Sequence, residues 1–226
     1  MNCIRFHVVL AACSVLLVAS CRSLTQSSYT SDPQGSDPEA QEVARRAAEL
    51  AAYPPPNLQL DLPIAQAPFA DVAVNWKQRG NQPYLYLDHI GDYRLAGPKI
   101  VDVFERMTEA EIPQFGPPFI LFYDDPAETP TDELRARVAI PVNSRITTPP
   151  SGLSFDVLPQ TVVVYSFIGG AYSEVPRAYP AMFEFLRKMR WALNGPIRET
   201  YLVSPASVAS FDELVTEVQI PGTQAR

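Results

Sequence analysis

Residues 212–221, DELVTEVQIP, decide the fold of this chain, because residues 132–141, DELRARVAIP, carry the same pattern at an offset of 80. The match extends outward from both segments. Further paired positions, at offsets of 78–80, are Gln82 with Gln160, Ile90 with Ile168, Tyr93 with Tyr172, Gly116-Pro117 with Gly195-Pro196, and Pro126 with Pro205. Self-similarity at a nearly fixed spacing indicates a repeated structural unit. We therefore predict two copies of one unit, over about residues 67–142 and 153–222.

Each copy has the pattern of a strand, a helix and two more strands. Residues 84–87 and 162–165 are β-branched or aromatic runs of strand length that end near glycines. Apolar residues then recur at helical spacing, and they are Ile100, Val101, Val103, Phe104 and Met107 in the first copy and Met182, Phe183, Leu186, Met189 and Leu193 in the second. Two strands follow in each copy, at 119–123 with 135–140 and at 198–203 with 214–220. One more strand should precede each copy, at 72–76 and 155–158.

This order of elements predicts an α+β fold of duplicated βαββ units. Each unit should form its own antiparallel sheet covered by one main helix, because a helix and a sheet each have one apolar face to bury. The pairing of two such units leaves a ligand groove between the repeats, on the side away from the helices.

The N-terminal residues 1–20 have the pattern of a signal peptide. Arg5 precedes an apolar run of 12 residues, 8–19, which is shorter than the roughly 20 that a membrane-spanning helix needs. The run ends in Val18-Ala19-Ser20-Cys21, which resembles the lipobox of bacterial lipoproteins and implies palmitate and diacylglycerol on Cys21. The alternative is an ordinary secretory signal that happens to contain Cys21. Arg22, rather than Asp, favours the periplasmic side of the outer membrane over the inner membrane, by similarity to Gram-negative lipoproteins.

Residues 21–66 are expected to join the lipidated Cys21 to the domain. Residues 22–36 are polar and lack periodicity, which is typical of a flexible tether. Asp37 and Pro38 then begin a short predicted helix that ends before the prolines at 54–56. The globular domain should therefore cover residues 67–226.

Charge and histidine content exclude several classes of function. The chain has 25 acidic and 18 basic residues, so it lacks the basic face that nucleic-acid binding needs. His89, the only histidine after the signal peptide, cannot build a metal cluster or a Ser-His-Asp triad, and we expect it in a surface turn. No cofactor is expected, since one histidine without a Cys-x-x-Cys-His motif is weak support for haem. The acidic residues between 124 and 133 lack the spacing of a calcium loop and are expected in a solvated turn.

The sequence resembles the GyrI-like small-molecule-binding family, the effector-binding domain of AraC- and MerR-type regulators. The resemblance rests on residues 89–93 (HIGDY), 116–126 (GPPFILFYDDP), 198–202 (RETYL) and 213–221 (ELVTEVQIP), and it extends over about residues 67–222. It implies a duplicated fold of SHS2-like repeats, an aromatic-lined pocket and a buried glutamate that attracts cationic or polar aromatic ligands. No helix-turn-helix precedes the matching region, so the resemblance does not imply a DNA-binding regulator.

Strand alternation supplies the candidate site residues. In 214–220 it directs Glu217 and Gln219 away from the core face, and in 198–203 it places Glu199 and Tyr201 on a common face. The candidate ligand-binding residues are Glu217, Glu199, Tyr201, Gln219, Tyr123 and Tyr165. The plainer interpretation is that the carboxylates are solvated and the tyrosines belong to the core.

Three functions follow from these residues. We favour an envelope-anchored protein that captures an aromatic or cationic small molecule between its repeats. The enzyme alternative is a hydrolase of electrophilic ring compounds, in which Glu199 or Glu217 moves a proton. The third is an envelope scaffold that binds a protein partner, with a groove filled by side chains such as Phe122.

Overall fold

The computed structural model describes residues 60–224, which form ten strands, two α-helices and five short 3-10 helices. The predicted signal peptide, Cys21, the polar tether and the short helix at 37–52 lie outside the described residues. The strands are β1 (Ile64–Ala65), β2 (Asn75–Arg79), β3 (Gln82–Ile90), β4 (Phe119–Phe122), β5 (Arg135–Pro141), β6 (Ser154–Leu158), β7 (Thr161–Gly169), β8 (Trp191–Leu193), β9 (Ile197–Tyr201) and β10 (Val215–Gln224). The helices are α2 (Lys99–Glu109) and α3 (Tyr179–Met189), with 3-10 turns η1 (Tyr93–Leu95), η2 (Thr131–Glu133), η3 (Tyr172–Ala178), η4 (Pro205–Ser207) and η5 (Phe211–Glu213).

All ten strands belong to one sheet, with the order β1-β7-β10-β9-β4-β5-β3-β6, while β2 also pairs with β7 and β8 with β10. The prediction of two separate antiparallel sheets was wrong, because β4 and β9 pair directly, with Phe119 opposite Thr200 and Phe122 opposite Ile197. Each of these strands would otherwise leave a row of unpaired backbone groups at the edge of its half. The sheet is also mixed, since the two-residue strand β1 runs parallel to β7.

The two halves exchange their first strands. β2 precedes β3 in the chain but pairs with β7 of the second half, and β6 precedes β7 but pairs with β3 of the first. Only Gly80-Asn81 connects β2 to β3, and only Pro159-Gln160 connects β6 to β7. The Asn81 side chain accepts a hydrogen bond from the Gln160 N–H at 2.7 Å. Such short connectors bring the two ends of the strand order together, so the sheet curves around the face opposite the helices.

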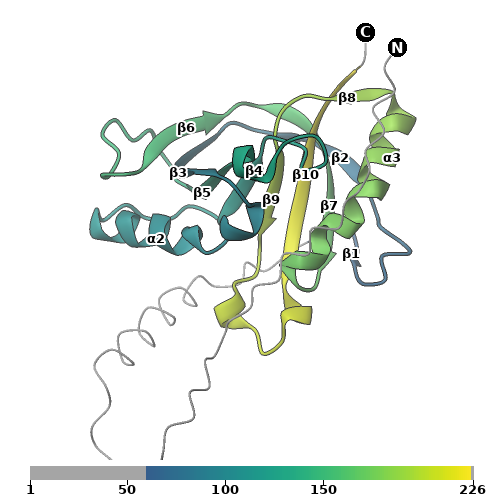
Figure 1. Ribbon diagram of the computed structural model, residues 1–226, viewed down its shortest axis with the longest axis horizontal. Helices are drawn as coiled ribbons and strands as arrows, with labels where there is room; N and C mark the ends of the chain where they lie inside the picture. Colours follow the sequence, from purple (N-terminus) through teal and green to yellow (C-terminus); the bar gives the residue numbers. More distant parts are fainter. Residues whose placement is uncertain (1–59, 225–226) are drawn as a thin grey trace, which may run out of the picture.

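Both α-helices pack on the same face of the sheet (Figure 1). Val103 and Met107 of α2 pack with Leu85, Val138 and Ile140 of the first half. Met182 and Leu186 of α3 make the equivalent cluster with Val164, Val218 and Ile220 of the second. In Figure 1, β9 and β10 run between the two helices.

Two local predictions need correction. The second helix ends at Met189 rather than extending to Leu193, because Arg190 takes a left-handed conformation with φ 57° and residues 191–193 turn into β8. His89 is buried, with 4% of its surface exposed, and its Nε2 lies 2.9 Å from the carbonyl oxygen of Asp92. Among residues 60–224, no helix is long and apolar enough to cross a membrane.

Candidate ligand-binding site

A cavity of about 870 Å³ lies over the junction of β4 and β9, between α2 and α3. Its lining comes from both halves of the chain and includes Ile100, Phe104, Ile120, Phe122, Tyr172, Tyr179, Phe183, Ile197, Glu199 and Tyr201. The groove was predicted on the side away from the helices, and it lies instead on the helix side, where the two helices stand apart. Phe122 forms part of the wall without filling the space, which is large enough for a drug-sized molecule.

Glu199 lies on the floor of this cavity, at the centre of the sheet. Alternation along β9 points it to the helix side, between Ile120 of β4 and Val218 of β10. Only 6% of its surface is exposed. Its Oε1 accepts a hydrogen bond from the Tyr179 hydroxyl, at the start of α3, and its Oε2 accepts one from the Tyr201 hydroxyl at 3.2 Å. The carboxyl group is therefore held in place from both sides.

Burial raises the pKa of Glu199 to about 7, and the two tyrosine hydrogen bonds offset only part of that effect. A carboxyl group with this pKa is present in both protonation states near neutral pH. Burial also raises the pKa of Tyr179 well above its usual value, and the nearby Glu199 adds to the shift. Tyr179 therefore stays a hydrogen-bond donor over the physiological range.

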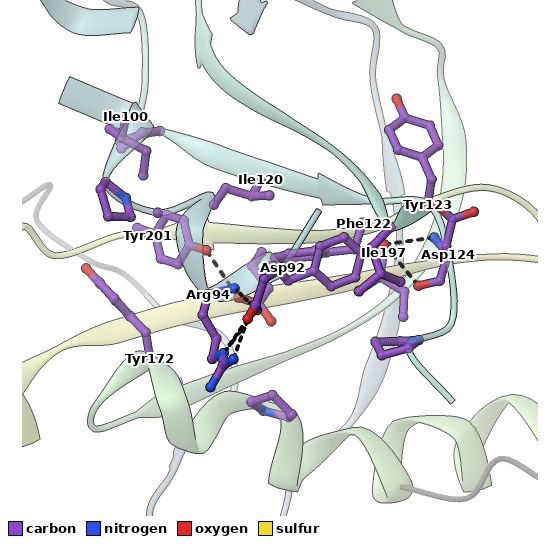
Figure 2. A pocket seen from close by; sticks show the side chains of 18 of the residues that line it. Asp92, Arg94, Ile100, Ile120, Phe122, Tyr123, Asp124, Tyr172, Ile197 and Tyr201 are labelled. Atoms are coloured by element: carbon purple, nitrogen blue, oxygen red, sulfur yellow. Dashed lines mark hydrogen bonds and ion pairs between the residues drawn. The ribbon is translucent and has the colours of Figure 1, made fainter. Parts of the chain in front are cut away.

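Aromatic rings form the walls on both sides of Glu199. The Tyr172 ring lies 4.6 Å from the Tyr201 ring, and the Tyr93 ring lies 4.8 Å from that of Phe122. The hydroxyl groups of Tyr172 and Tyr93 donate to the backbone carbonyls of Val203 and Arg135, at 3.2 and 3.0 Å. These hydrogen bonds hold the rings in fixed orientations. Figure 2 shows Tyr172 and Tyr201 next to each other, with Ile100 and Ile120 nearby.

Asp92, Arg94 and Asp124, which belong to two ion pairs, line the cavity on the side of the first half. Asp92 pairs with Arg94, and Asp124 pairs with Arg135 at 2.7 Å. In each pair the arginine side chain is more than half exposed, which places it towards solvent. Arginine hydrogen bonds lower the pKa of both carboxyl groups. These groups are already neutralised by partners, so Glu199 is the buried carboxylate that faces the apolar part of the cavity.

The structure separates the predicted site residues into two groups. Glu199 and Tyr201 lie together in the cavity, and Tyr123 belongs to its lining but points away from the other labelled side chains in Figure 2. Glu217, Gln219 and Tyr165 lie on the opposite face of the sheet. There, Lys77 forms an ion pair with Glu217 at 2.7 Å and stands 4.1 Å from the centre of the Tyr165 ring.

The site also contains residues that were not predicted. Tyr179 could not be found from strand alternation, because it reaches Glu199 from a helix twenty residues earlier in the chain. Tyr93 and Tyr172 were matched as equivalent positions of the two copies, and that match was a usable signal, since both line the cavity. Among the described residues, no group of three His, Cys, Asp or Glu side chains is placed to hold a metal ion.

Comparisons with known proteins agree with this architecture. A family model described as a GyrI-like small molecule binding domain matches residues 74–222. The C-terminal domain of EcmrR superimposes with a TM-score of 0.60 at 18% identity, over 68% of this chain and 99% of that domain. A hydrolase from Listeria innocua superimposes with a TM-score of 0.50 at 12% identity, over 72% of this chain and 94% of that protein. At these identities the likeness concerns the fold alone. No curated protein matches the chain.

Proposed function

Because this chain belongs to the GyrI-like family of small-molecule-binding domains, we propose that it captures an aromatic cation in the cavity over β4 and β9. One observation carries the proposal: a buried carboxyl group, Glu199, on the floor of an apolar cavity with aromatic walls. A cation gains from the carboxylate charge, and each ring face adds about 0.5–2 kcal/mol when water is excluded. A neutral aromatic molecule gains the apolar contact only.

The test compares pairs of ligands that have the same shape but differ in charge. Aromatic quaternary ammonium compounds and their neutral carbon isosteres are titrated against the purified full chain, and binding is followed by tyrosine and tryptophan fluorescence. We expect each cation to bind at least tenfold more tightly than its isostere, with the difference lost in Glu199→Gln. Equal affinities for the two members of every pair would exclude the proposal.

A second candidate function, a hydrolase of electrophilic ring compounds, is supported by the pKa of about 7 at Glu199. In its neutral form this group can donate its proton to the leaving atom of a strained ring, while the carbon–leaving-atom bond breaks. Water adds to the carbon, and its proton returns to the carboxylate, so that the net reaction consumes one water. Mass spectrometry of the ligands that bind distinguishes the functions, because turnover adds the mass of water and capture leaves the ligand unchanged.

We also propose that the protein is anchored in the bacterial envelope through a lipid on Cys21. The lipobox-like residues 18–21 and the apolar run before them support this assignment. Metabolic labelling with a palmitate analogue should mark the wild-type chain and leave Cys21→Ser unmarked, and the variant should leave the membrane fraction. Labelling of both proteins would contradict lipidation at this cysteine.

The two halves are, in our interpretation, copies of one βαββ unit. The order β3-α2-β4-β5 is followed by β7-α3-β9-β10 with β8 inserted after the helix, and the sequences match at an offset of 78–80. Duplication accounts for the position of the cavity at the junction, because each copy supplies one helix and one wall.

A further inference from the structure

The face of the sheet opposite the cavity carries a cluster of four cationic side chains, Lys77, Arg79, Arg137 and Arg198. Arg137 is neutralised by Asp156 at 2.7 Å and Asp88 at 3.2 Å. Lys77 is neutralised by Glu217 at 2.7 Å. Within the described part of the chain, neither Arg79 nor Arg198 forms an ion pair. Asp61, a further carboxylate on this side, accepts a hydrogen bond from the Tyr165 hydroxyl.

Arg198 is the more unusual of the two. Its side chain lies with the guanidinium carbon 4.0 Å from the centre of the Phe119 ring, and only 5% of the residue is exposed. No described residue accepts a hydrogen bond from its Nε. Arginine is protonated at neutral pH, so this is a buried positive charge that lies against an aromatic ring and has no ion-pair partner among the described residues.

Two neighbouring side chains also carry a donor group without a partner. Arg79 donates to the Gln219 side chain at 3.5 Å and to the Pro159 carbonyl at 3.2 Å, both neutral acceptors, and its Nε has no partner among residues 60–224. The Thr200 hydroxyl, two residues after Arg198 on the same face of β9, is buried and also lacks a hydrogen bond there. Three donor groups on one face therefore lack an acceptor.

The charge of Arg198 is energetically unfavourable as it stands. Burial and, to a smaller extent, the nearby charge of Arg79 lower its pKa to about 9, while Glu217 compensates only in part. Burial likewise lowers the pKa of Arg79. An uncompensated buried charge is among the costliest features of a protein interior, and a bound counter-ion with several acceptor atoms removes that cost.

We propose that Arg198, Arg79 and Thr200 form a binding site for a small oxyanion, a carboxylate or a phosphate, on the curved face of the sheet. The guanidinium groups supply charge-assisted donors and the Thr200 hydroxyl supplies a third, a set that suits an ion with two or more acceptor oxygens. Lys77, at the same end of the face, has a side chain that is 37% exposed. The site is independent of the proposed cation capture, because Arg198 and Glu199 point to opposite faces of β9.

Thermal unfolding of the purified full chain tests the site with phosphate, acetate and chloride as probes at equal ionic strength. We expect phosphate and acetate to raise the melting temperature of the wild type above its value in chloride, by roughly 5–10 °C at a hundredfold excess over the dissociation constant. In Arg198→Leu the three salts should give the same melting temperature. In chloride, this variant should be at least as stable as the wild type, because it removes an unpaired buried charge.

Two control variants separate site binding from general salt effects. Arg187→Leu removes an exposed arginine of α3 and should respond to the anions like the wild type, and so should Glu199→Gln in the cavity. If Arg198→Leu does not fold, Arg79→Gln and Thr200→Val make the same test, each expected to reduce the anion-specific shift. Equal shifts in the wild type and in the Arg198 or Arg79 variant overturn the proposal.

Discussion

Arg198 and Glu199 are neighbours in the chain, yet they lie in opposite surroundings. The side chains of β9 alternate, so Glu199 and Tyr201 line the apolar cavity while Arg198 and Thr200 face the cationic cluster. Both charged residues are almost completely buried, and their pKa values shift in opposite directions because burial disfavours the ionised form of each. Substitutions at these two positions should therefore have separable effects.

Glu199→Gln should weaken the binding of aromatic cations by about 10–100-fold, because it removes the buried negative charge and keeps the shape of the side chain. Isothermal titration with one cationic ligand measures the effect. Glu217→Gln is the matched control: it makes the same change on the opposite face, next to Lys77, and should leave the affinity unchanged. A larger loss in the Glu217 variant would move the ligand site to the other face.

Affinity for a cation should increase with pH and then level off above about pH 7. The ligand needs ionised Glu199, and a pKa of about 7 leaves roughly a tenth of the carboxyl groups ionised at pH 6. The dissociation constant should therefore be about tenfold weaker at pH 6 than at pH 8. In Glu199→Gln the residual affinity should not change with pH over this range.

The free energy of unfolding without ligand should change in the opposite direction. Native Glu199 keeps its proton up to about pH 7, whereas the unfolded chain releases it near the ordinary value of 4.5. Unfolding then releases a proton, so this residue lowers stability as pH rises from 4.5 to 7, by up to about 3 kcal/mol. Urea unfolding of the wild type and of Glu199→Gln at pH 5 and 8 measures the difference in their free energies of unfolding. At pH 8 this difference should favour the variant.

Only part of the candidate site could be predicted at the level of residues. Alternation correctly places Glu199 and Tyr201 on one face, because that pattern is a local property of a strand. It cannot decide which face of the sheet has the cavity, since that depends on how far apart the two helices stand. Glu217 and Glu199 were therefore equal candidates in the sequence, and the contact from Tyr179 could not be foreseen.

At the level of elements, the end of α3 shows how one residue ends a helix. Apolar spacing continues to Leu193, so periodicity alone predicts a longer helix than the structure contains. Arg190 interrupts it with a left-handed backbone, and its N–H bonds back to the last helical turn. Trp191 then begins β8, which pairs with the end of β10. Backbone conformation overrides the apolar pattern here.

Arg190→Gly should stabilise the protein by about 0.5–1 kcal/mol, because glycine adopts the left-handed conformation without the strain of a side chain. Lys188→Gly, two residues earlier within α3, is the contrasting control and should destabilise by about 1 kcal/mol. Urea denaturation measures both changes. A loss of stability in Arg190→Gly would mean that this side chain makes a contact worth more than the strain.

For the whole molecule, the element order was predictable and the assembly was not. Residue patterns located most of the strands and both helices of the two halves. However, β2 covers Asn75–Arg79 instead of residues 72–76, α3 ends at Met189, and β1 and β8 were not predicted. Strand pairing, however, depends on which edges meet in space, and nothing local distinguishes two sheets from the one sheet that β4 and β9 join. The exchange of β2 and β6 could not be predicted either, because it also depends on which strand edges meet in space.

A single continuous sheet should unfold in one cooperative transition. Both tryptophans, Trp76 in β2 and Trp191 in β8, report on the second half. Leu85→Ala in the first half should therefore lower the midpoint of tryptophan fluorescence as much as that of circular dichroism, with a loss of about 2–5 kcal/mol. Met182→Ala in α3 is the matching change in the second half. A fluorescence midpoint that stays fixed in Leu85→Ala would show independent halves.

The exchanged first strands have a consequence for how the protein is made. As the chain leaves the ribosome, β2 emerges long before β7, its partner, so the first half cannot complete its edge while it is alone. Folding must wait for pairings between distant parts of the chain, which are slow to form and leave strand edges exposed meanwhile. The newly made protein should therefore depend on holding chaperones until its last strand, β10, is available.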